Sequence, residues 1–387
     1  MYPFRAESVY VRNAWYVGCL AQEVSDTPFE RVIMDKPVVF FRTASGKVAA
    51  MHGLCPHRYY PLALHGKVIG ETLQCNYHGY TFDGHSGLCV RIPSAPKAPR
   101  NFHQRVYPVV ERGPWVWIWP GDPALADESK LPTLEELHLD ARFMASPLLK
   151  PVLVKARYML GLENLMDLTH IGFLHAASVD FEEIVQAPLS ISETDAQLRI
   201  VRKMRTSWGM VQDVLYKPEN RFAGKSESDS ETIVHTPGYV TNTSSTPREI
   251  EGVGPADPSV FGELWFHHVL TPATRHSTHY FGTQSRSHRR EETAFGELLH
   301  HIDTEIRSQD IEAMEAIEQR IQQFGEPPVE LMTKSDTAAG RLRRRLQRMI
   351  DLEVSSSTAA AGTEALNPAA KLAEPAVGPE EAAAQSA

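Results

Sequence analysis

Two short Cys/His segments constrain this chain of 387 residues more than any other feature. The sequence reads Cys55-Pro-His57 and, further along, Cys75-Asn-Tyr-His78. Two thiolates and two imidazoles could hold a tetrahedral zinc ion or a Rieske [2Fe–2S] cluster. In Cys₂His₂ zinc fingers the two cysteines come together and the two histidines follow. Here each segment supplies one of each, which favours the cluster because the same pair of loops can then serve both irons.

Composition and charge exclude several other classes of protein. The chain has four cysteines, too few for a disulfide-stapled scaffold of this size, and Cys19 and Cys89 outside the motif are expected to be inert buried thiols. With 39 Lys+Arg against 48 Asp+Glu, the net charge of −9 argues against a nucleic-acid partner. We find no apolar run long enough to span a bilayer and no signal-peptide pattern at the start, and so expect a cytoplasmic protein.

The hydrophobic pattern predicts an α+β protein that begins with an all-β domain over residues 1–122. Short runs rich in β-branched and aromatic residues, such as 15–20 and 37–42, are broken by polar turns. The run WVWIWP at 115–120 is closed by Pro-Gly-Asp-Pro, which is typical of the end of a strand. This first domain contains both Cys/His segments.

A catalytic domain is predicted over residues 123–353, with an antiparallel sheet flanked by helices. Strand-like runs occur at 198–201, 265–270 and 278–283. Helices are expected over 161–176, 293–324 and 336–351. Residues 354–387 are rich in Ala and Pro and lack aromatics, so we expect a disordered tail that cannot offset the entropy of ordering.

A second candidate metal site lies in the segment Glu163-Asn-Leu-Met-Asp-Leu-Thr-His-Ile-Gly-Phe-Leu-His175. His170 and His175 are five residues apart, about 500° around an ideal helix, so they can face one ion only if the helix ends or distorts near His175. Gly172 makes such a distortion feasible. Non-haem Fe(II) oxygenases use two histidines and one carboxylate. By pattern alone, the two histidines could equally be structural residues of an amphipathic helix.

Both segments resemble those of a known family. Cys-Pro-His-Arg followed by Cys-x-Tyr-His-Gly-Tyr-x-Phe-Asp-Gly resembles the Rieske signature of ring-hydroxylating and demethylating oxygenases. Asn-Leu-Met-Asp-Leu-Thr-His-x₄-His is similar to the iron-binding segment of the vanillate and dicamba O-demethylase oxygenase branch, and the resemblance covers roughly residues 8–350. It implies two cofactors. The cluster ligands would be Cys55, His57, Cys75 and His78, and the ligands of a mononuclear Fe(II) would include His170 and His175.

The resemblance also implies a third iron ligand and a path for electrons. The stretch from Ser308 to Arg320 is similar to the downstream helix of this branch, whose leading Asp completes the triad, which points to Asp310; Glu312 and Asp303 are the next candidates. In this family the residue matching Asp167 has a catalytic role without binding metal. It bridges a cluster histidine of one subunit to an iron histidine of its neighbour, which implies a head-to-tail ring, most simply a homotrimer.

The chain has no G-x-G-x-x-G fingerprint and no further Cys quartet, so it cannot take electrons from a nicotinamide by itself. We expect the terminal oxygenase of a multi-component monooxygenase fed by a separate NAD(P)H-dependent reductase of flavin or ferredoxin type. A Rieske electron carrier would not need the second histidine pair, and a zinc-binding structural protein is the other non-enzyme alternative.

The leading hypothesis for the reaction is O₂-dependent O-demethylation of a small, vanillate-like methoxylated aromatic acid, with release of formaldehyde. Aryl-methyl hydroxylation and dioxygenation of an aromatic ring or diaryl ether are the alternatives. The stretch His267-His268-Val-Leu-Thr-Pro272 is similar to one in the demethylases where a histidine lines the substrate site, which implies that His268 binds substrate. The competing interpretation is an ordinary half-buried strand histidine.

Overall fold

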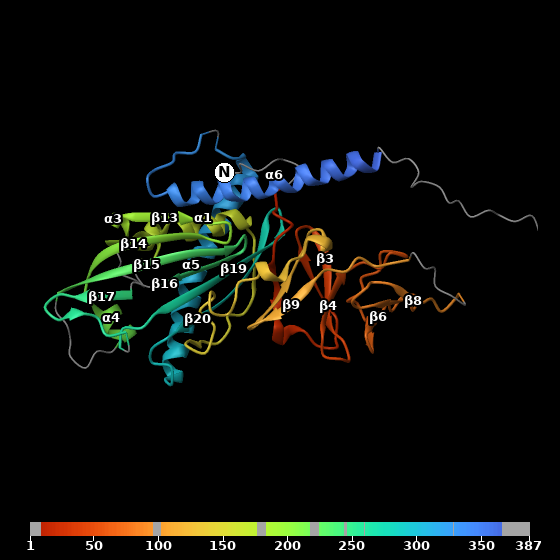
Figure 1. Ribbon diagram of the computed structural model, residues 1–387, viewed down its shortest axis with the longest axis horizontal. Helices are drawn as coiled ribbons and strands as arrows, with labels where there is room; N and C mark the ends of the chain where they lie inside the picture. The colour runs from red at the N-terminus through yellow and green to blue at the C-terminus, as the bar shows by residue number, and fades with distance from the viewer. Residues whose placement is uncertain are drawn as a thin grey trace, which may run out of the picture.

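The structure, a computed structural model, shows an elongated molecule in which a β-rich N-terminal region and a larger sheet-and-helix region lie end to end (Figure 1). It describes residues 9–95, 102–175, 183–216, 224–243, 246–258, 260–327 and 329–365. The α+β class predicted from the sequence is confirmed. In the described part of the chain, no helix is both long and apolar enough to cross a membrane.

Short antiparallel strands build the N-terminal region. Their bounds are β1 Tyr16–Leu20, β2 Phe29–Ile33, β3 Lys36–Arg42, β4 Val48–His52, β5 Lys67–Ile69, β6 Thr72–Gln74, β7 Thr81–Asp83, β8 Cys89–Arg91, β9 Val109–Arg112 and β10 Trp115–Ile118. They form the sheets β1-β10-β9, β2-β3-β4 and β5-β6-β7-β8. The last of these is a meander. The second Cys/His segment lies in its turn between β6 and β7, and the first lies in the loop between β4 and β5.

A large antiparallel sheet dominates the rest of the molecule. Its strands are β11 Met144–Ala145, β12 Val152–Val154, β13 Leu189–Glu193, β14 Leu198–Ser207, β15 Lys225–Thr236, β16 Tyr239–Thr243, β17 Thr246–Ile250, β18 Gly254–Pro255, β19 Leu264–Thr274 and β20 Ser277–Arg286. The main order is β11-β20-β19-β16-β15-β14-β13. β14 alternates strictly between buried and more exposed residues, which shows that one face of the sheet is covered.

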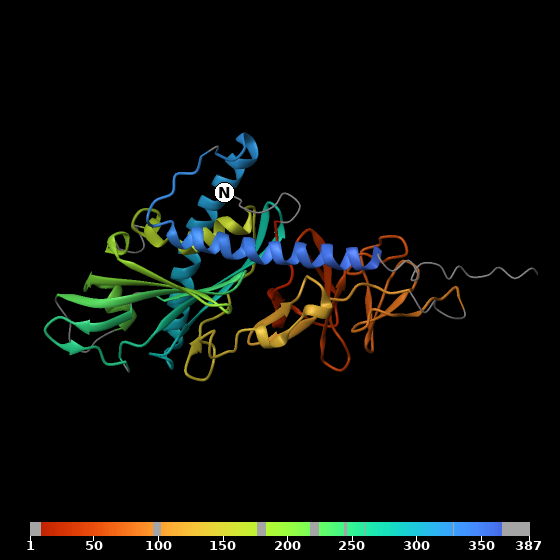
Figure 2. The ribbon, with the colours of Figure 1, turned by 45° about the horizontal axis from the view of Figure 1, so that its top comes forward.

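Helices pack around this sheet, with α5 and α6 the two long ones (Figures 1 and 2). The helical segments are η1 Ala21–Glu23, η2 Pro123–Leu125, η3 Glu128–Lys130, α1 Tyr158–Met166, η4 Leu168–His170, α2 Ile171–Leu174, α3 Glu183–Gln186, α4 Met210–Tyr216, α5 Thr293–Phe324 and α6 Thr337–Ala365. The predicted helix over 293–324 is confirmed in full.

The two regions are joined by extensive packing. Trp115 and Trp117 of β10 share one hydrophobic cluster with Val269 and Phe281 of the large sheet. In α6, which runs along both regions in Figure 2, the carboxylate of Glu353 accepts hydrogen bonds from backbone amides near the N-terminus. Because the two regions share one hydrophobic cluster, their packing does not locate a boundary between them. The domain boundary at 122/123 stays a prediction from the sequence.

The helix predicted over 161–176 is interrupted. α1 begins at Tyr158 and ends at Met166, because the carboxylate of Asp167 accepts a hydrogen bond from the Thr169 amide (3.0 Å) and caps a new turn, η4. α2 then ends at Leu174, directly before His175. The helix thus ends directly before His175, as the spacing of the two histidines required.

The prediction of disorder from residue 354 onward is wrong for its first part, because α6 continues to Ala365. The helix over 337–353 already supplies the costly nucleus, so each further residue needs only to propagate it, and no Pro stands before residue 368 to end it. Residues 366–387 lie outside the described part of the chain.

Candidate active site and metal centres

The two Cys/His segments fold into matching loops. In residues 55–60 and 75–80, the amide of the cysteine donates to the carbonyl of the tyrosine five residues later, at 2.8 Å in both loops. The cysteine carbonyl accepts from the residue four positions later, Tyr59 or Gly79, and both of these residues have left-handed backbones, with φ of 56° and 70°. The same local conformation therefore presents Cys and His from each loop.

The side chains of these loops fit a Rieske cluster. Cys55 and Cys75 are buried, and the amides of His57 and Arg58 donate to the Cys55 sulfur. Burial and the neighbouring Cys75 raise the pKa of Cys55, so the thiolate form needs a positive partner such as iron. The rings of His57 and His78 lie 4.7 Å apart between centroids, and the buried Nδ1 of His57 has no hydrogen-bond partner among the described residues. An orphaned ring nitrogen of this kind is what a metal ligand leaves when the metal is removed.

The positions of the four side chains also favour a two-iron cluster over a mononuclear zinc site. Across the described ranges, the only His, Cys, Asp or Glu group of three or more with ligand atoms within 4.8 Å of one another is His170, His175 and Asp310. The four side chains of the two loops therefore do not converge on one point, as a mononuclear zinc ion would require. Two cysteines beside two histidines match the split ligation of two irons.

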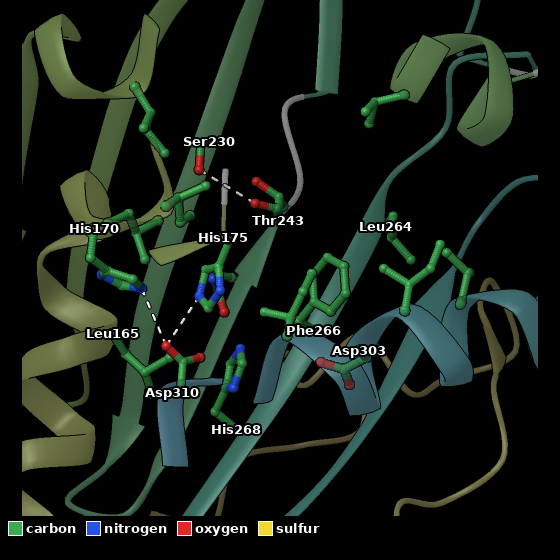
Figure 3. A pocket seen from close by; sticks show the side chains of 18 of the residues that line it. Leu165, His170, His175, Ser230, Thr243, Leu264, Phe266, His268, Asp303 and Asp310 are labelled. Carbon is green, nitrogen blue, oxygen red and sulfur yellow. Dashed lines mark hydrogen bonds and ion pairs between the residues drawn. The ribbon is translucent and has the colours of Figure 1, made fainter. Parts of the chain in front are cut away.

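The second site brings together the residues proposed as the iron triad. His170 ends η4, His175 follows α2, and Asp310 reaches them from α5, far away in the sequence (Figure 3). The Asp310 Oδ1 atom lies 3.1 Å from the His175 Nε2 atom and 3.5 Å from the His170 Nε2 atom. Burial alone would raise the pKa of Asp310, but hydrogen bonds and charge from the two histidines hold it well below its usual range. Two imidazoles and one carboxylate at these distances fit a mononuclear Fe(II).

Hydrogen bonds to the outer ring nitrogens orient both histidines. His170 Nδ1 donates to the carbonyl of Asp167 (2.7 Å), and His175 Nδ1 donates to Gln309 Oε1 (2.6 Å). When a metal ion is bound, each Nε2 atom would give its lone pair to the ion in place of its contact with Asp310. Asn164 donates to the Asp310 carboxylate (3.0 Å). Gln309 and Asn164 were missed by the sequence analysis, although Gln309 directly precedes the predicted ligand.

Asp167 lies at the junction of α1 and η4 and is half-buried. Its carboxylate caps η4, and burial, which raises its pKa, is outweighed by hydrogen bonds from Thr169 that lower it. The carbonyl of Asp167, and not its carboxylate, accepts from His170. The cluster loops of the same chain lie in the other region of the molecule, beside β4 and β6 (Figure 1). The bridging role of Asp167 remains a prediction.

A cavity of about 300 Å³ opens beside the triad. Its walls are mostly aliphatic, with Phe266 as an aromatic member, and Ser230 and His268 are among its polar members (Figure 3). Asn242 also lines it. The side-chain oxygen of Asn242 is buried and has no hydrogen-bond partner in the described part of the chain. Sequence patterns gave no signal for Asn242, since its role depends on the pairing of β16 with β19.

Consecutive histidines on β19 have different environments, because side chains alternate between the faces of a strand. His267 is fully buried, with Nδ1 3.0 Å from the Tyr239 hydroxyl and Nε2 2.8 Å from the Ser285 hydroxyl. His268 pairs Nδ1 with the Tyr280 hydroxyl (2.6 Å) and lines the cavity. The position predicted to bind substrate is thus beside the triad, and its neighbour is the structural histidine.

Family models match both regions of the chain. The Rieske [2Fe-2S] domain matches residues 14–108, and the vanillate O-demethylase oxygenase C-terminal domain matches residues 154–352. The oxygenase component of dicamba O-demethylase from Stenotrophomonas maltophilia is 33% identical over 359 residues, covering 89% of this chain and 99% of that protein. A toluene-4-sulfonate monooxygenase iron-sulfur subunit from Comamonas testosteroni is 29% identical, over 89% of this chain and 98% of the subunit.

Solved structures agree with these matches. The crystal structure of dicamba monooxygenase with non-haem iron and dicamba superposes with a TM-score of 0.73 at 29% identity, over 90% of this chain and 100% of that one. Both predicted cofactors and the monooxygenase class are thereby confirmed, with electrons supplied through a separate reductase. The chain belongs to the Rieske non-haem iron oxygenases, in the branch of the vanillate and dicamba O-demethylase oxygenase components.

Proposed function

We propose that this oxygenase O-demethylates a small methoxylated aromatic acid of vanillate-like size. The observation that carries this proposal is the mainly apolar cavity of about 300 Å³ directly beside His170, His175 and Asp310. When bound, the cluster supplies single electrons and the mononuclear iron activates dioxygen. The methyl ether, O₂, two electrons and two protons give a hemiacetal and water, and the hemiacetal breaks down to formaldehyde and a phenol.

Different residues of the cavity would bind different parts of the substrate. Leu165, Phe266 and Leu299 form apolar walls that would hold an aromatic ring and exclude water. No Lys or Arg is found among the described residues that line the cavity. The acid group of the substrate would therefore be bound by neutral donors, with His268 and Asn242 the proposed ones.

The proposal includes a head-to-tail homotrimer in which each cluster serves the iron of a neighbouring chain. It is supported by the placement of the two sites in different regions of one molecule, the cluster loops beside β4 and β6 and the triad on the segment after α1 and on α5 (Figure 1). It is also supported by exposed aromatic residues at both sites, with Phe173 beside the triad 77% exposed and Tyr77 beside the cluster 59% exposed. In such a ring Asp167 would connect the two centres.

Replacing Asp167 by Asn tests the bridge. The variant is expected to keep both metals, because Asp167 is not a ligand, and to lose turnover because electrons no longer reach the iron. Metal content, the visible spectrum and oxygen uptake are measured together. Turnover at the wild-type rate would remove the bridging assignment, and a monomeric holoenzyme in light scattering would remove the ring.

The reaction itself is tested by measuring formaldehyde and oxygen uptake together, with iron-loaded protein, NADH and a surrogate reductase. Vanillate, syringate, veratrate and a methyl-substituted benzenesulfonate form the panel. Formaldehyde equal to the oxygen consumed is expected from at least one methoxy compound. Oxygen uptake without formaldehyde, giving a product heavier by one or two oxygens, would contradict O-demethylation.

Aryl-methyl hydroxylation is the second candidate, favoured by the similarity to the toluene-4-sulfonate monooxygenase subunit. The sulfonate in the panel would then be the substrate that consumes oxygen. The cell compartment proposed is the cytoplasm. Cys19 and Cys89, the two cysteines outside the cluster loops, are unpaired and support it, because a reducing compartment keeps thiols unpaired.

A further inference from the structure

His268 is the first of a connected row of buried polar side chains that leads away from the cavity. It lies on β19, and the Tyr280 hydroxyl on the neighbouring strand β20 is 2.6 Å from its Nδ1 atom. Behind Tyr280 is Arg307 of α5, whose Cζ atom is 4.8 Å from the centroid of the tyrosine ring. All three side chains are at most 7% exposed, so bulk water does not compete for their hydrogen bonds.

The direction of the hydrogen bonds follows from the donors available. A guanidinium is positively charged and can only donate, so the Tyr280 hydroxyl turns its oxygen, and not its proton, toward Arg307. Burial raises the pKa of Tyr280, although the charge of Arg307 opposes this, so the hydroxyl keeps its proton. The acceptor within reach of that proton is Nδ1 of His268.

The tautomer of His268 is then determined. Burial holds the pKa of His268 well below its usual range, so the ring is neutral. A neutral imidazole that accepts at Nδ1 carries its proton on Nε2. Within the described ranges Nε2 has no hydrogen-bond partner, and the ring lies at the wall of the cavity near Asp310 (Figure 3).

Arg307 is itself fixed in place. Asp303 accepts from its Nε and Nη2 atoms, both at 2.9 Å, and the carbonyl of His267 accepts from Nη2 at 2.9 Å. Gly282, opposite His268 on β20, leaves the room that the guanidinium needs, since a Cβ there would lie 2.5 Å from Nη1. The side chains from Arg307 on α5 through Tyr280 to His268 at the cavity are therefore held in position before a substrate binds.

We propose that Tyr280 and Arg307 are positioning residues that hold His268 as a hydrogen-bond donor, through Nε2, to the acid group of the substrate. This inference rests on the proposed function, and it adds a physical reason why the enzyme would select methoxyarenes that carry an acid group. A substrate without an acceptor leaves a buried N–H unpaired, and buried unpaired donors are costly. The enzyme thus discriminates against methoxyarenes that lack an acid group.

Vanillate and guaiacol, which is vanillate without its carboxyl group, test the proposal. Dissociation constants by calorimetry and kcat/KM are measured for both compounds with wild-type holoenzyme and with Tyr280→Phe, which keeps the ring and removes the hydroxyl. The preference of the wild type for vanillate is expected to fall about tenfold in the variant, with guaiacol unchanged, because the donor is no longer fixed.

Tyr239→Phe is the matched control. Its hydroxyl bonds to His267 in the same way but on the other face of the sheet, so the variant loses a buried Tyr–His hydrogen bond without touching the cavity. It is expected to keep the wild-type preference. Equal losses for vanillate and guaiacol in Tyr280→Phe, or an unchanged preference, would overturn the proposal. Calorimetry gives this answer even when neither compound releases formaldehyde, so a failure of the proposed reaction is distinguished from a failure of the inference.

Discussion

The two metal-binding regions of this molecule are built in opposite ways. The cluster loops, 55–60 and 75–80, lie close together in sequence and repeat one backbone conformation. The triad instead joins a broken helical segment to a carboxylate 135 residues beyond His175. The first site is formed by two neighbouring loops of the N-terminal β region, whereas the second exists only when α5 packs against the rest of the fold.

Removing a cluster ligand is the strongest test of this contrast. Cys75→Ser is expected to lose the cluster, its visible absorption and all turnover, while the mononuclear iron still binds. Metal and sulfide analysis of the purified variant measures this. Cys89→Ser serves as the control, because Cys89 is buried in the same meander outside the motif. Loss of both metal centres from Cys75→Ser would show that the sites are not independent.

Asp310→Ala is expected to have the opposite effect to Cys75→Ser, with loss of the mononuclear iron and retention of the cluster. The mononuclear iron is expected to be lost and turnover to fall by more than the roughly 100-fold seen when only an outer-shell partner is removed, while the cluster spectrum stays normal. Glu312→Gln is the control on the same helix, since Glu312 is exposed. Retention of iron in Asp310→Ala, with loss in Glu312→Gln, would move the third ligand to Glu312.

Gln309→Leu tests whether the hydrogen bond from His175 to Gln309 orients the His175 ring for metal binding. It leaves the three ligands and removes the acceptor for His175 Nδ1. Iron affinity is expected to fall roughly 10- to 100-fold, with no change at the cluster. Titration of the iron-depleted protein with Fe(II) measures the affinity, and wild-type affinity would mean that packing alone orients His175.

The smallest expected effect concerns the contact that holds α1 to α5. Arg157, which precedes α1, is paired with Glu318 of α5, and both are buried. Burial raises the pKa of Glu318, but the hydrogen bond from Arg157 outweighs it and the pKa is lowered from 4.5. A lowered folded-state pKa stabilises the fold above the unfolded-state pKa, and this contribution is lost as the pH falls through the folded-state value.

Glu318→Gln is therefore expected to cost about 2 kcal/mol at pH 7, because Arg157 loses its fully buried partner and keeps only the more exposed Glu326. The variant is also expected to lose less further stability on acidification than the wild type. Urea unfolding at pH 7 and pH 4 measures both quantities. An identical pH dependence in the two proteins would exclude Glu318 as a source of acid sensitivity.

The features that could be predicted from the sequence are those set by local patterns, and the features that could not be predicted depend on packing between distant segments. The strands predicted at 15–20, 37–42 and 115–120 and the helix predicted at 293–324 depend on local patterns, and the structure places strands and a helix there. Asp310 could be chosen from the other acidic residues of α5 only through the family resemblance. Gln309, Asn242 and Tyr280 were not predictable, because strand pairing and helix packing decide what they contact. The break at Asp167 and the extension of α6 arise from capping and helix propagation, which the periodic pattern does not show.

Diffraction from crystals of the iron-loaded protein, recorded at the iron absorption edge, tests the two-site account most directly. Two adjacent anomalous peaks are predicted between Cys55, Cys75, His57 and His78, and a third peak between His170, His175 and Asp310. A single peak at the cysteine loops, or a third peak away from Asp310, would contradict the account.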